Sequence, residues 1–147
     1  MHVAIEPAKN EDLAALFALL ERSGLPKDGL VEHLSTTLVA RAGGSVVGSA
    51  ALELYGSAAL LRSVAVDPPL RGKGLGTLLT HAALTRARQH GVREIYLLTE
   101  TAGEFFSRFG FQPIDRAEVP PAIQASVEFT SACPTTALVM ALRLPHL

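Results

Sequence analysis

The chain has 147 residues, which is enough for one domain with a hydrophobic core and too few for two ordinary domains. Hydrophobic residues make up 48% and charged residues 18% of the chain, so a disordered protein is excluded. The net charge of −1 gives no electrostatic basis for binding nucleic acid or an anionic membrane surface, and the single cysteine excludes a disulfide framework and a cysteine-rich metal site.

The sequence also lacks the patterns of membrane insertion and export. No apolar run is long enough for a transmembrane helix, and the N-terminus has no signal-peptide pattern. We therefore expect one domain over residues 1–147 in the cytoplasm, with no nucleic-acid partner and no membrane partner.

The first third of the chain is predicted to be a strand followed by two helices. Residues 3–6 favour a short strand that ends at Pro7. Residues 9–24 have helical spacing, with the apolar side chains on one side and Gly24 at the end. A second, weaker helix is predicted over 26–34.

Residues 36–66 change to the strand period, with turn residues at 42–45 and 55–58. This pattern predicts an antiparallel meander of three strands. A long helix is predicted over 75–91, with Gly91 as its C-cap. Its expected apolar stripe is Leu75, Leu78, Leu79, Ala82, Ala83 and Ala87.

The last third is predicted to alternate strands and helices. Strands are expected at 92–99, 111–114 and 136–144, and helices at 102–110 and 120–129. The order of elements predicts an α+β domain whose sheet is mixed but mostly antiparallel.

The stretch "DPPLRGKGLGTLL" places three glycines between the meander and the long helix: Gly72, Gly74 and Gly76. A helix N-terminus offers unpaired N–H groups and a positive dipole end, and glycine lets a ligand approach the backbone closely. Arg71 and Lys73 add positive charge. A phosphate site is therefore favoured over a merely flexible turn. The Gly-Lys-Ser/Thr ending of a P-loop is missing, and Leu79 replaces the third glycine of a dinucleotide fingerprint.

These residues resemble two signatures of the GCN5-related N-acetyltransferase (GNAT) family. Arg71-x-x-Gly74-x-Gly76 after "SVAVDPPL" is similar to its acyl-CoA-binding motif, and "FFSRFGF" (Phe105–Phe111) is similar to its aromatic helix ending in Gly-Phe. The resemblance covers nearly the whole chain. It implies the GNAT fold, with about seven strands in a mostly antiparallel mixed sheet flanked by helices, and strands splayed around the acyl-CoA site.

A finer resemblance involves "LRSVAV", "LLTETAGEFFSRFGF", "DRAEVP" and "EFTSACP". These segments are similar to small arsN-type acetyltransferases found with arsenic-resistance genes and, more distantly, to domains that make N-acetylglutamate. Some arsenic-associated relatives acetylate glutamate analogues that carry arsinic or phosphinic groups.

The family resemblance implies acetyl-CoA as the acyl donor and no metal. The amides of the glycine loop would hold the pyrophosphate, and the backbone of residues 64–66 would pair with the pantetheine arm. The residues expected to bind acetyl-CoA are Val64, Ala65, Val66, Arg71, Gly72, Lys73, Gly74, Leu75, Gly76, Thr77, Phe105 and Phe106. Family members often place an acidic Tyr at the position of Phe106, so this chain departs from the pattern there.

The expected catalytic groups are few. An α-amine titrates near about 8 in model peptides, so a weak base or a water chain suffices to deprotonate it. The amide of Val64 is expected to stabilise the oxyanion. The family's carboxylate on the last meander strand is missing here, and Glu53 is the nearest replacement as a base. A surface salt bridge between Glu53 and Arg62 is the equally supported alternative.

Arg62 is the main candidate for binding the acceptor, because arginine holds carboxylates bidentately. The alternative is that its guanidinium only reaches solvent at the rim of the sheet. Four further residues are candidates for the acceptor site: Ser63, His33, Glu100 and Thr101. Ser63 could instead only fill a small site, and Glu100 and Thr101 could instead cap the next helix. Cys133 is expected to be a small buried residue.

The sequence thus predicts an acetyl-CoA-dependent N-acetyltransferase of a small amine, an amino acid or glutamate-like analogue, with a role in arsenic resistance as the finer hypothesis. One alternative is another acceptor class, such as a protein N-terminus, a polyamine or an aminoglycoside. The other is a non-catalytic acyl-CoA sensor. The expected partner is the small-molecule amine, and a homodimer is left open.

Overall fold

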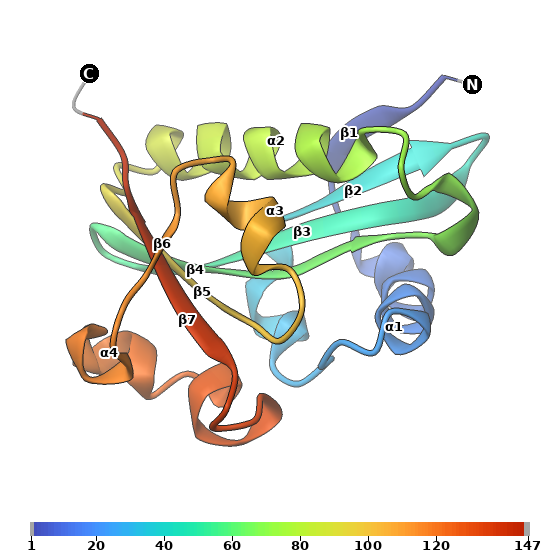
Figure 1. The fold of residues 1–147 in the computed structure, drawn as a ribbon. Coiled ribbons are helices and arrows are strands. Elements are labelled where there is room, and N and C mark those ends of the chain that lie inside the picture. The colour runs from blue at the N-terminus through green and yellow to red at the C-terminus, as the bar shows by residue number, and fades with distance from the viewer. Residues whose placement is uncertain (1, 146–147) are drawn as a thin grey trace.

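The computed structural model describes residues 2–145, which form one sheet with helices on both faces (Figure 1). The strands are β1 (Ala4–Pro7), β2 (Thr37–Ala42), β3 (Ser45–Tyr55), β4 (Ala58–Val66), β5 (Glu94–Thr99), β6 (Gln112–Pro113) and β7 (Leu138–Arg143). The α-helices are α1 (Leu13–Arg22), α2 (Leu75–Gln89), α3 (Gly103–Ser107) and α4 (Pro121–Gln124). Short helical turns are η1 (Asn10–Asp12), η2 (Leu30–Thr36), η3 (Pro68–Leu70), η4 (Arg116–Glu118) and η5 (Glu128–Ala132).

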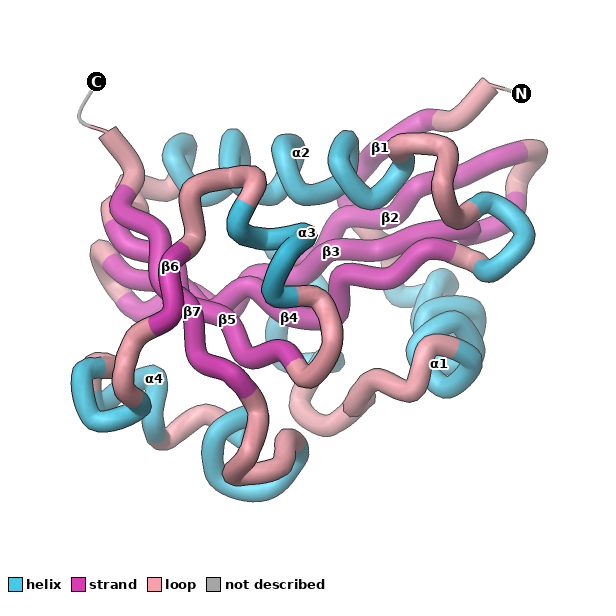
Figure 2. The backbone as a smooth tube through the Cα atoms, in the orientation of Figure 1, coloured by secondary structure: helices cyan, strands magenta, loops and turns pink. Residues whose placement is uncertain are grey.

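The sheet has seven strands in the order β1-β2-β3-β4-β5-β7-β6 (Figure 2). All neighbours are antiparallel except β4 and β5, which are parallel. The predicted mixed, mostly antiparallel sheet of about seven strands is therefore confirmed. The predicted helix over 120–129 is split in the structure into α4 and the separate turn η5.

Strands β4 and β5 pair only along Ala58–Leu60 and Glu94–Tyr96. Beyond these residues β4 stays paired with β3, and β5 stays paired with β7 as far as Thr99. The two halves of the sheet therefore diverge, and Figures 1 and 2 show the opening between β4 and β5. This divergence makes room for a cleft in the middle of the sheet.

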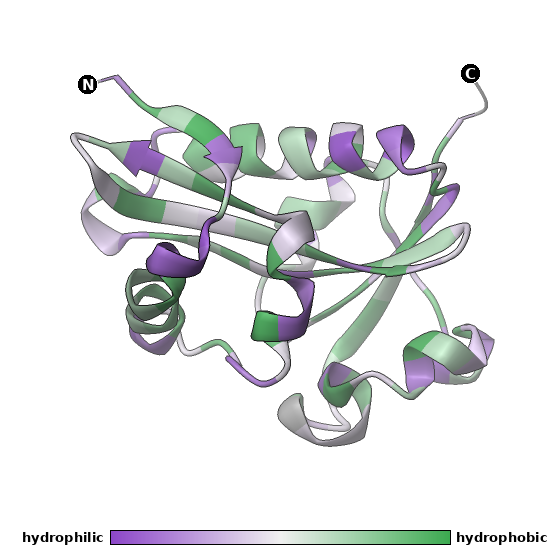
Figure 3. Ribbon diagram, turned by 180° about the vertical axis from the view of Figure 1, so that it is seen from behind, coloured by the Kyte–Doolittle hydropathy of each residue, from purple (hydrophilic) through white to green (hydrophobic). Residues whose placement is uncertain are grey.

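Three hydrophobic clusters stabilise the two halves of the sheet. The largest lies between the sheet and the layer of α2 and α3, and includes Leu61 and Leu79. On the opposite face, one cluster packs α1 and η2 under β2–β4, and another packs the α4 region under β5 and β7. Seen from behind in Figure 3, α1 carries mainly hydrophobic colour, as expected for a helix packed on the sheet.

The apolar stripe of α2 differs from the prediction at Leu78, whose side chain is exposed (58%). Leu84 is buried instead, beside Leu79, Ala83 and Ala87. Residues four apart lie one above the other on a helix, so the line through 75, 79, 83 and 87 faces the sheet. Leu78 lies beside that line and faces solvent. Within residues 2–145, no helix combines the length and the hydropathy needed to cross a bilayer.

We expect Leu79→Ala to lower the free energy of unfolding by about 2–5 kcal/mol, because it removes a fully buried side chain from the largest cluster. The matched control is Leu78→Ala on the same helix, which should change that free energy by less than about 0.5 kcal/mol. Urea unfolding followed by circular dichroism measures both. Equal losses would show that Leu78 also belongs to the core.

Candidate active site

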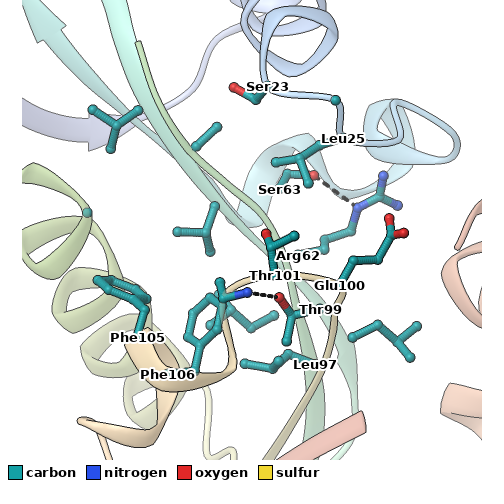
Figure 4. A pocket seen from close by; sticks show the side chains of 18 of the residues that line it. Ser23, Leu25, Arg62, Ser63, Leu97, Thr99, Glu100, Thr101, Phe105 and Phe106 are labelled. Carbon is teal, nitrogen blue, oxygen red and sulfur yellow. Dashed lines mark hydrogen bonds between the residues drawn. The ribbon is translucent and has the colours of Figure 1, made fainter. Parts of the chain in front are cut away.

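A cleft of about 770 Å³ occupies the space where β4 and β5 separate (Figure 4). Its walls come from β4, the end of β5, the start of α2, and α3. The loop after α1 (residues 23–26) closes one side, and Glu128 and Cys133 reach it from the η5 region. Segments far apart in the sequence therefore meet at one site.

A β-bulge in β4 shapes the cleft. Ser49 lies opposite Ala65 and Ala51 opposite Arg62, so two residues of β4 lie opposite one residue of β3. At the bulge Ser63 has φ of +58°, a conformation that non-glycine residues rarely adopt. Its carbonyl accepts a hydrogen bond from Ser49 Oγ at 2.7 Å, which holds the strained backbone. Such strain is typical of functional sites.

The start of α2 forms a second part of the site. Gly72 and Gly74 have φ of +80° and +83°, and a Cβ at either position would meet nothing within 4 Å. These glycines are therefore required by backbone conformation, and the space beside them is open. In the described part of the chain, no backbone N–H of residues 72–77 donates to a backbone carbonyl outside α2. The open loop thus presents unpaired donors at a helix N-terminus.

Arg71 ties this loop to the end of β4. Its Nε donates to the carbonyl of Val66 at 3.0 Å, and its Nη2 lies 3.5 Å from Ser23 Oγ. Arg22 pairs with Asp67 at 3.0 Å close by. The loop after α1 and the loop before α2 are therefore linked across one end of the cleft.

The opposite wall is aromatic. Phe105 and Phe106 of α3 meet edge to face with their ring centroids 5.0 Å apart, and both line the cleft. Figure 4 shows them on one side of the pocket, and Arg62 with Ser63 on another. Thr99 Oγ1 accepts a hydrogen bond from the N–H of Ala102 and so fixes the start of α3. Phe106 carries no hydroxyl, so it cannot donate a proton to a leaving group.

Arg62 lies at the bottom of the cleft with a fully buried side chain. Its Nε donates to Ser63 Oγ at 3.2 Å, its Nη1 to Glu53 Oε2 at 2.9 Å, and its Nη2 to the carbonyl of Pro26 at 3.4 Å. The ion pair between Glu53 and Arg62 is therefore present, but it is buried and not at the surface, and the alternative of a solvated rim cation is wrong. A guanidinium has five N–H donors, so Arg62 keeps donor capacity beyond these three bonds.

Glu53 lies behind Arg62 and does not line the cleft. Burial acts to raise its pKa, but hydrogen bonds from Tyr55, Ser126 and Arg62, together with the charge of His33, hold the pKa below its ordinary value. A saturated carboxylate with a lowered pKa is a poor base. Its position therefore does not favour the role expected from the sequence. His33 Nε2 is 3.9 Å from Glu53 Oε2, and His33 likewise lies outside the cleft.

Most of the other predicted site residues meet at the cleft. Those that line it are Arg62, Ser63, Val64, Ala65, Val66, Arg71, Gly72, Gly74, Leu75, Gly76, Thr77, Glu100, Thr101, Phe105 and Phe106. Lys73 is exposed and lies outside it.

Glu128 and Cys133 are among the cleft residues that were not predicted to act there. Glu128 is 5% exposed, and its Oε2 has no hydrogen-bond partner while it lies 3.5 Å from Arg62 Nη2. The thiol of Cys133 is half-buried and lies 3.5 Å from Glu128 Oε1. No local spacing in the sequence indicates that Glu128 reaches the cleft. Among residues 2–145, no three His, Cys, Asp or Glu side chains gather closely enough to hold a metal ion.

Comparison with known proteins finds acetyltransferases. An uncharacterised N-acetyltransferase of Chlorobaculum tepidum, CT2212, is 35% identical over 97 residues, which are 65% of this chain and 62% of that protein. The amino-acid acetyltransferase of Mycobacterium tuberculosis is 40% identical over 78 residues, which are 52% of this chain and 44% of that protein. The chain thus spans less than two thirds of the length of these relatives.

Solved structures share the fold along nearly the whole chain. The N-acetylglutamate synthase of Neisseria gonorrhoeae, complexed with coenzyme A and N-acetyl-glutamate, matches with a TM-score of 0.85 and 24% identity, over 99% of this chain and 36% of that one. Rv2747 of Mycobacterium tuberculosis, in complex with CoA and NLQ, matches with a TM-score of 0.82 and 26% identity, over 97% and 99%. The family model of the acetyltransferase (GNAT) domain matches residues 33–113, more than half of the chain. This chain therefore belongs to the GNAT acetyltransferase family.

Proposed function

We propose that the chain is an acetyl-CoA-dependent N-acetyltransferase that acetylates the amine of a small acceptor, an amino acid. One observation carries the proposal: a single cleft runs from the unpaired amides at the start of α2, along the bulged strand β4, to the buried Arg62. This arrangement offers one end to a phosphate-bearing donor and the other to an acceptor. Relatives named amino-acid acetyltransferases, and related structures that contain coenzyme A, support the same assignment.

The donor end would bind the pyrophosphate of acetyl-CoA. Amides of residues 72–77 at the N-terminus of α2 would donate to its oxygens, and Arg71 adds positive charge. The pantetheine arm would lie along β4 at residues 64–66, where the separation from β5 leaves that edge of the strand open. Phe105 and Phe106 would provide the apolar wall beside the thioester.

The reaction needs a neutral amine, a stabilised oxyanion and a departing thiol. The amine nitrogen would attack the thioester carbonyl, and the amide of Val64, at the β4 bulge, would donate to the developing oxyanion. Phe106 would leave the sulfur without an enzymatic acid. A thiol pKa near about 8.5 makes departure as thiolate feasible without one.

The acceptor end would be defined by Arg62, with Ser63, Glu100 and Thr101 around it. A buried guanidinium with unused donors suits a carboxylate, and an amino acid carries one next to its amine. The finer assignment to arsN-type acetyltransferases stays a prediction, so arsinic and phosphinic glutamate analogues belong among the acceptors to be tested.

Thiol release from acetyl-CoA tests the proposed function directly. We expect release to depend on an added amino acid, with glutamate and its arsinic and phosphinic analogues in the panel. Simple amines, an aminoglycoside and a peptide N-terminus provide the comparison. A protein that binds acetyl-CoA but releases no thiol with any acceptor would be a sensor, and that result would contradict the proposed enzymatic activity.

Gly74→Asp should weaken acetyl-CoA binding by about tenfold to a hundredfold relative to Gly74→Asn, because only the aspartate brings negative charge to the phosphate site. Asn is the matched control, since both side chains are of similar size and both tolerate the positive φ at this position. Isothermal titration calorimetry measures both affinities. Equal values in folded variants would contradict the pyrophosphate site.

Arg62→Lys should lower kcat/KM for an amino acid by about tenfold more than for an amine without a carboxylate, because lysine keeps the charge but loses the fork. Lysine is preferred to alanine here, since Arg62→Ala would leave Glu53 buried without its partner, at a cost of about 3–5 kcal/mol of stability.

Arg143→Lys is the matched control for Arg62→Lys, because the Arg143 side chain is 83% exposed and lies outside the cleft. It should leave both rates unchanged. Equal losses for acceptors with and without a carboxylate in Arg62→Lys would show that Arg62 does not select amino acids.

A further inference from the structure

We infer that Glu128 is the general base of the acceptor site: its carboxylate receives the ammonium group of the acceptor and removes one proton before the amine attacks. This inference rests on the proposed function and names a group that acts within the same cleft. Three observations support it: a carboxylate oxygen of Glu128 that accepts no hydrogen bond, the balance of buried charge, and the position of Glu128 beside Arg62.

The first observation is the contrast between two buried glutamates in one network. Glu53 Oε1 accepts hydrogen bonds from Tyr55 and Ser126, and its Oε2 accepts one from Arg62. Glu128 Oε1 has only the thiol of Cys133 at 3.5 Å, and its Oε2 has no hydrogen-bond partner. A buried carboxylate oxygen without a donor is costly, so such an atom requires an explanation, and a donor supplied by a ligand in the cleft provides one here. Glu128 lines the cleft, and Glu53 does not.

The second observation is the charge of the network. The cation Arg62 is shared by two carboxylates, Glu53 at 2.9 Å and Glu128 at 3.5 Å. When both glutamates are ionised, the group of Arg62, Glu53 and Glu128 carries one excess negative charge, which attracts a cation. His33 can offset this charge only when protonated, and it approaches Glu53, not Glu128. A positively charged amino group therefore suits the open face of Glu128.

The third observation is the match to an amino acid. Glu128 Oε2 and Arg62 Nη2 lie 3.5 Å apart at one end of the cleft. An α-amino acid carries its ammonium and its carboxylate on the same carbon, so it can place the ammonium on Glu128 and the carboxylate on Arg62. The pair then selects amino acids through two complementary charges.

The environment of Glu128 also suits a base. Burial raises the pKa of Glu128, with added repulsion from Glu53 and Asp28, while Arg62 and the Cys133 thiol act in the opposite direction. The pKa of Cys133 is itself raised to about 12 by burial and by Glu128, so the thiol stays protonated. A carboxylate whose pKa is raised is a better proton acceptor than that of an ordinary glutamate.

The step balances as follows. Glu128 takes one proton from the ammonium and becomes a neutral carboxylic acid, and the free electron pair of the amine forms the C–N bond at the thioester carbonyl. When the C–S bond breaks, the sulfur departs as thiolate and takes up the second proton from the nitrogen. Glu128 then returns its proton to water in the cleft. The products are the N-acetylated acceptor, coenzyme A as the thiol, and one proton.

The test is Glu128→Gln, which keeps the shape of the side chain and removes the base. At pH 7 we expect kcat/KM for an amino acid to fall by about a hundredfold or more, with acetyl-CoA affinity unchanged. The deficit should shrink as pH rises above the pKa of the acceptor's amine. It should also be small for a weakly basic amine that is already neutral at pH 7. The matched control is Glu11→Gln, the same change at an exposed position, which should not alter the rates.

Thermal unfolding separates this role from a structural one. Because the fold raises the pKa of Glu128, its ionised form is disfavoured in the folded state, and that loss of stability grows as pH rises through the raised pKa. Glu128→Gln should therefore have a Tm at pH 7 no lower than that of the wild type. A lower Tm of Glu128→Gln, or a rate deficit that is the same at every pH and for every amine, would contradict the role of Glu128 as general base.

Failure of this inference differs from failure of the proposed function. If the wild type transfers acetyl groups to amino acids and Glu128→Gln does so equally well, only the role of Glu128 as general base is wrong. If the wild type releases no thiol with any acceptor, the proposed acetyltransferase function is wrong.

Discussion

Strands β4 and β5 are hydrogen-bonded only at Ala58–Leu60 and Glu94–Tyr96, and the candidate active site exists because they separate beyond those residues. Neither strand loses its place in the sheet, since β4 stays paired with β3 and β5 with β7. The separation exposes an inner strand edge, which proteins normally cover. In the proposed function this edge is covered by the pantetheine arm of acetyl-CoA, so the missing strand pairing becomes the donor site.

The packing on the two faces explains how the separation is maintained. The layer of α2 and α3 spans both halves of the sheet with one continuous cluster. On the other face the core is divided, with one cluster under β2–β4 and another under β5, β7 and the first residues of β4. Arg62 connects these two regions, because it bonds to Pro26 after α1 and faces Glu128 from the η5 region. Polar contacts therefore hold the divided face at the proposed acceptor end of the cleft.

The buried charge network of Arg62, Glu53 and Glu128 is a costly way to stabilise the fold. Buried ion pairs lose hydration, and an apolar replacement of similar volume is often as stable. Glu128 adds to this free-energy cost because one of its carboxylate oxygens accepts no hydrogen bond. A carboxylate kept in this state is better explained by the chemistry of an acceptor amine than by stability, in line with the usual trade between stability and activity.

Local sequence patterns determined most of the fold and the residues of the proposed donor end of the site. The glycines before α2, the order of elements and the aromatic helix are local signals, and most residues predicted from them line the cleft. Three features depended on the tertiary structure: the bulge at Ser63, the exposed face of Leu78, and the partners of Arg62. The bond from Ser126 to Glu53 joins residues 73 apart, and a non-glycine bulge leaves no mark in the sequence. Periodicity reports which face of an element is apolar, but only the packing of distant segments decides which buried charges meet, and that is why Glu128 came to light only in the folded chain.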